Sequence, residues 1–576
     1  MATDSSANPG PTDDRPPRVL GIEGTAWAAS AALYDGDEVV IETDAYEPDS
    51  GGIHPREAAE HMHDAIPRVV ETVLEHAAET TDERPPIDAV AFSRGPGLGP
   101  CLRVVGTAAR ALAGTLEVPL IGVNHMVAHL EIGRHAADFD DPVCLNASGA
   151  NAHLLAYRNG RYRVLGETMD TGVGNAIDKF TRHVGWSHPG GPKVEQAAKD
   201  GEYVDLPYVV KGMDFSFSGI MSAAKAAVDE GHAVEDVCFS LQEHIFAILT
   251  EVAERALSLT GSDELVLGGG VGHNARLREM LETMCADRGA EFYAPEPRFL
   301  GDNAGMIAVL GAKMYAVGDT LEISDSRVDP DFRPDQVPVT WRSDEPDRAV
   351  VGGDDGGESR DEAASESEDE ATSVSDDEAA SETTIRGAEA VVTLEPEAGR
   401  VRKRRRPKRY RHPDLDARLR RERTTLEARL TSHARRAGVP TPVVRDVDLQ
   451  EATLEFEYVG DDDLQAALTV DRVESVGRSL ATIHEAGFVH GDPTTRNVRV
   501  DADRTYLIDF GLGYHSDHLE DYAMDLHVFD QSLVGTADEP EPLREALRAG
   551  YREAGDGAVL ERLREIEHRG RYVEKE

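Results

Sequence analysis

Two histidines one helical turn apart are the residues of this chain best suited to hold a metal ion. His125 and His129 lie in the stretch Val123–Glu131, with small and apolar residues between them. Residues four apart share one face of a helix, so both imidazoles can reach a single cation. Two ordinary helix histidines would have the same spacing, so this assignment depends on what the rest of the chain brings to the helix.

An aspartate far along the chain is the natural third ligand. Asp302 stands in Phe299–Met306, at the start of a predicted helix. An aspartate there often only caps the helix, but a carboxylate also suits a site with two imidazoles. A zinc peptidase is not predicted, because its glutamate base follows the first histidine directly and Met126 occupies that position.

Three strand-and-turn patterns indicate a nucleotide-binding scaffold. The strand Arg18–Thr25 ends in a Glu-Gly-Thr turn that is a plausible phosphate loop, and the strand Val143–Ser148 repeats the pattern with the turn Ser148–Asn151. The strand Glu264–Val271 enters a glycine-rich turn, where an adenine or ribose can lie against backbone. Such repeated halves predict an α/β fold of the actin/Hsp70 kind. Between them we expect helices over 54–78, 102–116, 214–225, 233–259 and 275–288, and strands over 87–93 and 119–123.

Composition is that of a large globular protein. With 576 residues the chain is too long for one core. It has no apolar run long enough to cross a membrane, and its polar N-terminus lacks a signal-peptide core, so we expect a cytoplasmic protein. The four cysteines are widely spaced and indicate reduced thiols rather than a zinc cluster.

The charge balance indicates a cytosol of very high salt. The net charge is −48, and only nine of the 60 basic residues are lysine. Salt at about 1 M screens repulsion beyond about 3 Å, so a halophile tolerates such a surface. Part of the excess is local, because residues 352–384 hold 13 acidic residues and one arginine.

This acidic segment divides the chain. It has almost no large apolar residues and cannot order itself by burial, so residues 326–384 are predicted to form a flexible linker. We therefore expect a disordered N-terminus over residues 1–17, a first domain over 18–325 and a second, smaller α+β domain over 385–576.

The second domain carries residues typical of a kinase. Asp492 and Asn497 lie five residues apart, and Asp509 opens an Asp-Phe-Gly turn after a strand. In this arrangement Asp492 orients or deprotonates the acceptor, while Asn497 and Asp509 hold Mg²⁺ against the phosphates of ATP. Lys403, paired with Glu427, would steady the α- and β-phosphates.

A basic run begins the second domain and has two interpretations. Arg400–Arg411 contains nine basic residues in twelve. It is either a strand with solvated alternate residues or an RNA-facing patch, extended by Arg569, Arg571 and Lys575. Phosphate contacts weaken steeply with salt, so in a halophile we expect shape contacts and partner subunits to assist the patch.

Residues 18 to about 325 resemble the universal tRNA threonylcarbamoyltransferase family, which is TsaD in bacteria and a KEOPS subunit in archaea and eukaryotes. The motifs GIEGTA, GPGLGPCLRV, NHMVAHLE, SGAN, GNAIDKF, PGGPKVE, GGGVGHN and GDNAG occur in family order. The resemblance implies a duplicated ASKHA fold and one divalent metal, iron or zinc, on His125, His129 and Asp302.

The same resemblance implies a site for threonylcarbamoyl-AMP. Archaeal members often have a tyrosine that contacts the metal where this chain has Asn146, so we expect a substrate contact there rather than a metal contact. The adenylate contacts implied are Asn146, Ala147, Ser148, Gly149, Ala150, Asp178, Gly191, Glu195 and Asn274.

The second domain resembles the small atypical kinase of KEOPS, including its GAEA, YRHPDLD and RGRYVEK stretches. It lacks the glycine-rich GxGxxG and Ala-Pro-Glu motifs, and too few residues follow Asp509 for a full protein-kinase C-lobe. The resemblance implies ATP contacts at Gly387, Ala388, Glu389 and Ala390, in the predicted strand Ile385–Leu394. It also implies an ATPase activity that supports the modification cycle.

Together these features predict a bifunctional tRNA-modifying enzyme. It would transfer the threonylcarbamoyl group from threonylcarbamoyl-AMP to the exocyclic amine of the adenosine beside the anticodon, in tRNAs that read ANN codons. The expected partners are tRNA, ATP, the small KEOPS subunits and a threonylcarbamoyl-AMP synthase, with no membrane. The alternative is a nucleotide-sensing ASKHA domain tethered to a regulatory serine/threonine protein kinase.

Overall fold

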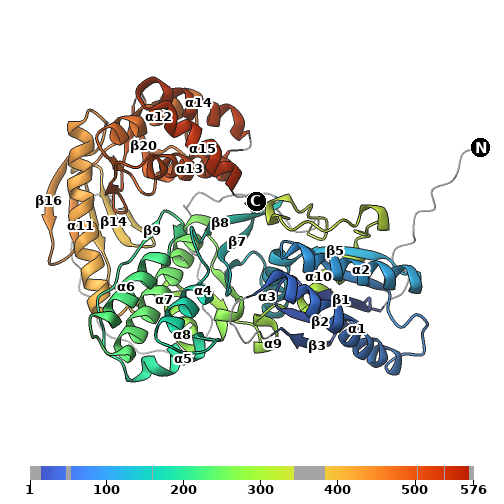
Figure 1. The fold of residues 1–576 in the computed structure, drawn as a ribbon. Coiled ribbons are helices and arrows are strands. Elements are labelled where there is room, and N and C mark those ends of the chain that lie inside the picture. The colour runs from blue at the N-terminus through green and yellow to red at the C-terminus, as the bar shows by residue number, and fades with distance from the viewer. Residues whose placement is uncertain are drawn as a thin grey trace, which may run out of the picture. The chain divides into compact units, whose positions relative to one another are not determined.

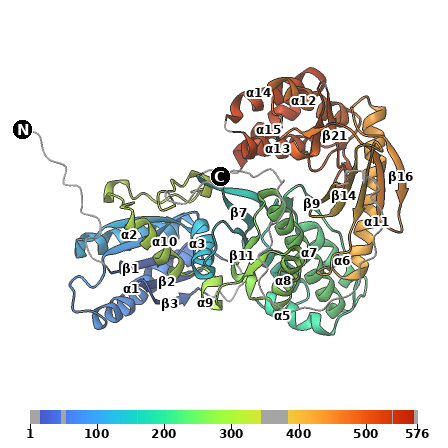
Figure 2. The same ribbon diagram turned by 180° about the vertical axis from the view of Figure 1, so that it is seen from behind.

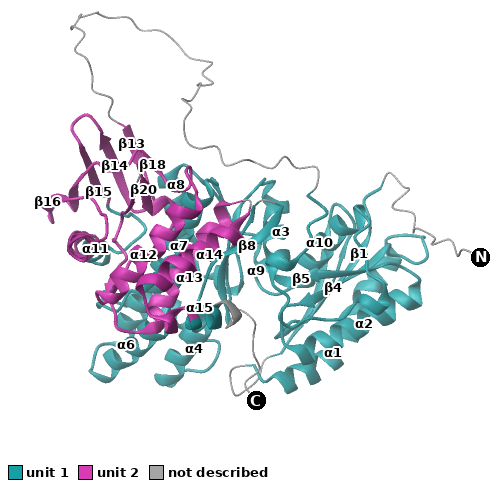
Figure 3. Cartoon of the chain, turned by 90° about the horizontal axis from the view of Figure 1, so that it is seen from above, with its two compact units in different colours: residues 1–345, 407–419, 561–576 teal, residues 346–406, 420–560 magenta. Residues whose placement is uncertain are grey.

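Two compact units make up the described part of the chain (Figure 3). Unit 1 comprises residues 1–345, 407–419 and 561–576, and unit 2 comprises residues 346–406 and 420–560. The computed structural model describes residues 15–46, 53–158, 160–342, 383–502, 504–537 and 539–569. Most of the predicted disordered N-terminus and acidic linker, together with Arg571 and Lys575, lie outside these residues.

Unit 1 is built on two five-stranded sheets with the same strand order and directions. In the first sheet β1 pairs antiparallel with β2 and parallel with β4; in the second, β6 pairs antiparallel with β7 and parallel with β11. The predicted strand–turn–strand units are therefore present in both sheets. The strands are β1 (Val19–Glu23), β2 (Ala28–Tyr34), β3 (Val39–Ala45), β4 (Ala89–Gly95), β5 (Leu120–Asn124), β6 (Val143–Ala147), β7 (Ala152–Arg158), β8 (Arg161–Glu167), β11 (Glu264–Gly268) and β12 (Glu291–Tyr293).

Helices bury both faces of each sheet, which explains the apolar strands (Figure 1). The helices α1 (Pro55–Glu79) and α2 (Gly99–Leu116) cover one face of the first sheet. On its other face, α3 (His125–Ala137) and α10 (Ala304–Ala316) share a core with residues of the second sheet (Figure 2). The remaining helices of this part are α4 (Val173–His183), α5 (Gly191–Ala197), α6 (Ser218–Asp229), α7 (Val234–Thr260), α8 (Ala275–Arg288) and α9 (Pro297–Leu300).

Glycines allow α3 and α10 to pack directly against strands. A Cβ at Gly21 of β1 would lie 2.4 Å from the carbonyl oxygen of Ala304 and 2.7 Å from the nitrogen of Ala308. A Cβ at Gly133 of α3 would lie 2.2 Å from a methyl of Val266. These contacts place the start of α10 and the body of α3 at short, fixed distances from the two sheets.

One predicted helix begins later than expected. Residues 214–225 were expected to be helical, but Asp214–Phe215 form β10, which pairs with β9 (Val210–Lys211), and α6 begins only at Ser218. The prediction was wrong at its start because Asp214 accepts a hydrogen bond from the N–H of Glu167, 2.9 Å away, which ties it to β8.

Two segments beyond the predicted first domain belong to unit 1. Residues 326–342, assigned to the linker from sequence, contribute Val337 and Trp341 to the core around α3 and α10. In residues 407–419, Tyr410 is 2% exposed and packs in the core around α7, and Arg411 pairs with the buried Glu251 at 2.6 Å. Burial of aromatic rings and ion pairing hold both segments in place.

Unit 2 contains an antiparallel sheet in the order β13-β14-β15-β17-β16, and helices. The expected single strand Ile385–Leu394 is instead two strands, because Gly387 donates a backbone hydrogen bond to Ala390 and turns the chain. Helix α11 begins in unit 1, and helix α15 ends there. The strands are β13 (Thr383–Arg386), β14 (Ala390–Glu395), β15 (Arg400–Arg405), β16 (Val444–Asp448), β17 (Thr453–Glu457), β18 (Asp462–Asp463), β19 (Phe488–Val489), β20 (Val498–Val500), β21 (Thr505–Leu507) and β22 (Tyr514–His515). The helices are α11 (Pro413–Arg436), α12 (Val470–Glu485), α13 (Leu519–Thr536), α14 (Pro540–Ala554) and α15 (Gly557–Arg569). Across the described ranges, none of the helices has the length and apolar character needed to span a bilayer.

The close contact between β1 and α10 predicts that a side chain at position 21 would destabilise the fold. We expect Gly21→Ala to lower the free energy of unfolding by about 1–3 kcal/mol, because the added methyl meets helix backbone that cannot rotate away. Thermal unfolding of the full chain in molar KCl measures this. In α6, a Cβ at Gly219 meets nothing within 4 Å, so Gly219→Ala is the matched control and should be neutral or slightly stabilising. Equal melting of the two variants would contradict the close packing.

Candidate functional site

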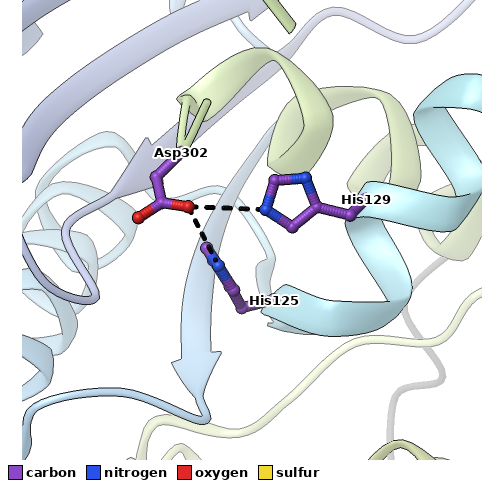
Figure 4. A group of neighbouring side chains, drawn as sticks. All are labelled: His125, His129 and Asp302. Carbon is purple, nitrogen blue, oxygen red and sulfur yellow. Dashed lines mark ion pairs between the residues drawn. The ribbon is translucent and has the colours of Figure 1, made fainter. Parts of the chain in front are cut away.

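The structure brings His125, His129 and Asp302 together in unit 1 (Figure 4). One ligand atom from each residue lies within 4.8 Å of the others. Oδ1 of Asp302 is 3.3 Å from Nε2 of His125 and 3.4 Å from Nε2 of His129. The predicted i, i+4 pair and its distant carboxylate therefore face one small volume.

Helix capping explains why these side chains are available. Asn124 caps α3, because its Oδ1 accepts hydrogen bonds from the N–H groups of Met126 and Val127. At α10 the cap is Asn303, which accepts from Met306 at 3.2 Å. Asp302 is thus not the cap of its helix, and its carboxylate is left to face the histidines.

A second carboxylate, Glu23, orients the first histidine. Glu23 is fully buried on β1, and its Oε2 lies 3.1 Å from Nδ1 of His125. Its other oxygen accepts the N–H of Thr25 at 2.7 Å. The carboxylate of the expected phosphate loop is therefore engaged with His125, a role that the sequence analysis missed. The available signal was an ionisable residue inside an otherwise apolar strand.

Neighbouring carboxylates determine the pKa of His125 in this cluster. Burial alone would lower the pKa of His125, but Glu23 and Asp302 outweigh it and raise that pKa to about 10. Burial lowers the pKa of His129, and the histidines hold the pKa of Asp302 well below its usual range against the effect of burial. Two buried carboxylates thus face two imidazoles, and this donor set fits a divalent metal ion.

A buried charge cluster connects α3 to α10. Glu131 of α3 accepts hydrogen bonds from Lys313 of α10 at 2.7 Å, from Tyr162 of β8 at 2.6 Å and from Arg134 at 3.0 Å. Burial would raise the pKa of Glu131, but Lys313 and Arg134 lower it to about 2. The carboxylate stays charged and holds α3 against α10. The sequence analysis did not single out these residues.

The residues predicted to contact the adenylate also lie in unit 1, around the second sheet. Asn146 and Ala147 end β6, and Ser148–Ala150 form the turn to β7, where Gly149 accepts a hydrogen bond from the N–H of Asn175 at 2.8 Å. Oδ1 of Asn146 is buried without a hydrogen-bond partner among the described residues. This leaves a polar atom available beside the turn.

The other predicted adenylate residues connect neighbouring helices. Asp178 of α4 accepts the N–H of Gly190 at 2.7 Å, immediately before Gly191 begins α5. Glu195 of α5 accepts the N–H of Ala275 at 3.0 Å, beside Asn274, the cap of α8. Hydrogen bonds thus join α4, α5 and the start of α8 into one region.

The kinase residues form a second centre, in unit 2. Nζ of Lys403 on β15 is 2.9 Å from Glu427 on α11 and 2.7 Å from Asp509. Nδ2 of Asn497 donates to the backbone oxygen of Asp492 at 2.9 Å. Burial would raise the pKa of Asp509, but Lys403 and Arg405 lower it to about 2. Charged Lys403 and Asp509 are the groups expected to hold phosphate and magnesium.

The turn predicted to contact ATP and the loop around Asp492 are also held in place. Gly387, Ala388 and Glu389 connect β13 to β14, and Glu389 pairs with Arg423 of α11. The buried Asp525 accepts the N–H groups of His490 at 2.6 Å and Gly491 at 2.8 Å. Asp525 therefore positions the loop around Asp492, a role that was not predicted from the sequence.

Most basic side chains of the run Arg400–Arg411 have acidic partners, although four of its arginines are exposed, and the RNA-facing interpretation stays a prediction. Seven of its nine basic side chains are ion-paired within their own unit, and Arg405 and Arg411 are buried. The acidic partners lie from 5 to 160 residues away in the sequence. The pairs are Arg400–Glu395, Lys403–Glu427, Arg404–Glu451, Arg405–Glu427, Lys408–Glu254, Arg409–Asp287 and Arg411–Glu251.

Comparisons with known proteins bear on both units. Residues 37–309 match the TsaD model, described as tRNA N6-adenosine threonylcarbamoyltransferase, and residues 480–566 match the phosphotransferase enzyme family. A curated relative from Halobacterium salinarum, named "Probable bifunctional tRNA threonylcarbamoyladenosine biosynthesis protein", is 67% identical over 96% of this chain and 98% of its own length. The chain belongs to this family. The predicted pairing of a TsaD domain with a kinase-like domain is confirmed.

Relatives with the same name come from haloarchaea and from methanogens. The Haloarcula marismortui protein is 65% identical, and the alignment covers 96% of this chain and all of the relative. The Methanospirillum hungatei protein is 50% identical over 96% of this chain and 99% of the relative. Members of this family thus share both domains in one chain.

The hydrogen bond between Glu23 and His125 yields a prediction about metal affinity. We expect Glu23→Gln to weaken metal binding by about 10- to 100-fold, because loss of the carboxylate leaves the imidazole less basic and less firmly oriented. Competition with a chromophoric chelator in molar KCl measures the affinity. Glu42→Gln, at an exposed position of β3, is the control. Unchanged affinity in Glu23→Gln would show that Glu23 does not serve the metal ligand.

Proposed function

We propose that this chain synthesises threonylcarbamoyladenosine in tRNA, and that unit 1 carries the transfer step. The proposal rests chiefly on one observation, the convergence of His125, His129 and Asp302 in a chain that belongs to the bifunctional family. In the reaction, the exocyclic amine of the adenosine beside the anticodon of ANN-decoding tRNAs attacks the carbonyl carbon of threonylcarbamoyl-AMP. A C–N bond forms, the bond to AMP breaks and the amine loses a proton.

The residues around the second sheet are proposed to hold the adenylate. The turn Ser148–Ala150 offers backbone N–H groups, and Gly149 and Gly191 leave open space because a Cβ at either would meet nothing within 4 Å. Asp178 and Glu195 present carboxylates suited to ribose hydroxyls. Asn146 and Asn274 add amide groups beside them. Support comes from the hydrogen bonds that join these elements into one region.

The three ligand residues are proposed to hold one divalent cation, iron or zinc. When bound, such a cation polarises carbonyl or phosphoryl oxygens of the substrate. Glu23 keeps the imidazole of His125 in a fixed orientation, and Glu131 keeps α3 against α10. These residues maintain the geometry of the site.

Unit 2 is proposed to be an ATPase that supports the same cycle. Lys403 with Glu427 would hold the α- and β-phosphates, Asn497 and Asp509 the magnesium, and Asp492 the acceptor or water. The turn formed by Gly387–Ala390 would lie near the nucleotide. The name shared by the relatives favours this role over the alternative of a regulatory protein kinase.

The remaining assignments follow from the same account. The two sheets of unit 1 share one topology, which supports a duplicated ASKHA domain. We propose that unit 1 is the transferase domain, extended beyond residue 325 by residues 326–342 and 407–419, and that unit 2 is the kinase domain. The enzyme would work in the cytoplasm of a halophile, with the small KEOPS subunits and a threonylcarbamoyl-AMP synthase. The net charge of −48 and the haloarchaeal relatives support the halophilic setting.

Loss of either kind of metal ligand should abolish transfer. With radiolabelled threonine, ATP, bicarbonate, the synthase and the small subunits at molar KCl, we expect wild type to label unmodified tRNA. His125→Ala and Asp302→Ala should reduce this to background while the unfolding transition persists. Full labelling by either variant would remove the metal assignment, and no labelling by wild type would favour the regulatory alternative.

A further prediction concerns the kinase residues of unit 2 and can be tested separately from the transfer step. We expect Asp509→Asn to abolish ATP hydrolysis by the full chain, because the amide no longer supplies the negative charge that holds magnesium. Steady-state phosphate release measures this, and Asp462→Asn at an exposed position of unit 2 is the control. A single round of transfer from preformed threonylcarbamoyl-AMP should persist in Asp509→Asn. Normal ATPase activity in this variant would contradict the assigned role.

A further inference from the structure

A depression lined by basic side chains lies on unit 1 where α4 and α6 meet. Lys179, Arg182 and His183 of α4 and Lys225 of α6 line an open space of about 210 Å³. The chain as a whole carries 108 acidic and 60 basic residues. A concave surface with four basic groups is therefore opposite in sign to the net charge of the chain.

The lysines in this depression differ from the other lysines of the chain. Eight of the nine lysines lie in the described ranges, and Lys179 and Lys225 are the two among them that have no hydrogen-bond or ion-pair partner. Arg182 likewise has none within the described ranges. Partners are present for Lys193, Lys199, Lys211, Lys313, Lys403 and Lys408.

Helix electrostatics account for only part of this cluster. Arg182 and His183 lie in the last turn of α4, where positive charge is favoured by the helix dipole, and His183 contacts Asp229 at 2.9 Å. Lys179 lies earlier in α4, and Lys225 lies outside the last turn of α6. Three like charges without acidic partners repel one another, so their gathering favours an anionic ligand.

We infer that this depression binds backbone phosphates of the tRNA substrate. The inference rests on the proposed transferase function and names the part of unit 1 that would hold the RNA. Helix α4 starts beside the turn Ser148–Ala150 and carries Asp178, so the basic groups of its second half lie about two helical turns from the proposed adenylate site. Phosphates held there position the RNA near that site without reading its sequence.

The basic side chains of this depression differ from those of the run Arg400–Arg411 in their pairing. The charges of Arg400–Arg411 are mostly neutralised by internal acids, whereas Lys179, Arg182 and Lys225 remain available to solvent or ligand. In molar salt each phosphate contact adds little to the affinity for tRNA. The depression therefore supplies position, and the rest of the affinity comes from other contacts.

Binding of tRNA by a charge-deleted variant tests this site. In the full chain, Lys179→Ala, Arg182→Ala and Lys225→Ala are combined, and fluorescence anisotropy of a labelled ANN-decoding tRNA transcript is followed from 0.3 to 2 M KCl. We expect at least fivefold weaker binding at the low-salt end. The slope of log K against log salt should be shallower by about 2, as expected for the loss of three phosphate contacts.

The matched control removes three positive charges elsewhere on unit 1. Arg56→Ala, Arg68→Ala and Arg298→Ala delete exposed side chains that are each paired with an acid, and should leave the affinity and its salt slope near wild type. Replacing Lys179 and Lys225 by arginine should preserve binding. Equal affinity and slope in the two triple variants would overturn the inference.

Transfer assays separate this inference from the proposed function. We expect the Lys179/Arg182/Lys225 variant to raise KM for tRNA and leave KM for threonylcarbamoyl-AMP unchanged. A wild type that modifies tRNA, beside a triple variant with the same KM, would contradict the phosphate site alone. Absence of transfer by wild type would contradict the function itself. A triple variant that binds tRNA normally but no longer co-elutes with the small subunits would assign the depression to an acidic protein and overturn the inference.

Discussion

The packing of α10 against β1 and α3 is the constraint on which the proposed metal site depends. Gly21 lets the backbone of β1 touch the start of α10, and Lys313, further along α10, reaches Glu131 on α3. Asp302 lies immediately before Asn303, the cap of α10, and the two histidines lie in the first part of α3. The distances between ligand atoms are therefore set by helix packing, and a shift of α10 would separate them without any change in the ligands themselves.

Buried ion pairs serve both units of this acidic protein. Glu131 holds two helices together in unit 1, and the Lys403–Glu427 pair connects β15 to α11 in unit 2. Salt screens such buried pairs much less than surface pairs. At molar salt they are therefore the electrostatic contacts that remain specific. Lys313, Lys403 and Lys408 each pair with a buried acid in this way, whereas Lys179 and Lys225 have no partner among the described residues.

Sequence predicts the local parts of this molecule better than its long-range contacts. The spacing of His125 and His129 predicts a shared helix face because that relation is contained in five consecutive residues. The carboxylate of Glu23 meets His125 only after β1 and β5 have joined one sheet, so no local pattern reveals the contact. The partners of the basic run could not be predicted for the same reason, since Arg411 donates to Glu251, 160 residues away in the sequence.

The central claim is that one cation is held by the two imidazoles of α3 and by the carboxylate of Asp302, two residues before α10. X-ray absorption spectroscopy at the metal edge of the loaded full-length protein tests it most directly. The account predicts scattering from two imidazoles, with nitrogen or oxygen neighbours at about 2.0–2.2 Å, and one imidazole fewer in His129→Ala. A spectrum without imidazole scattering, or one that His129→Ala leaves unchanged, would contradict it.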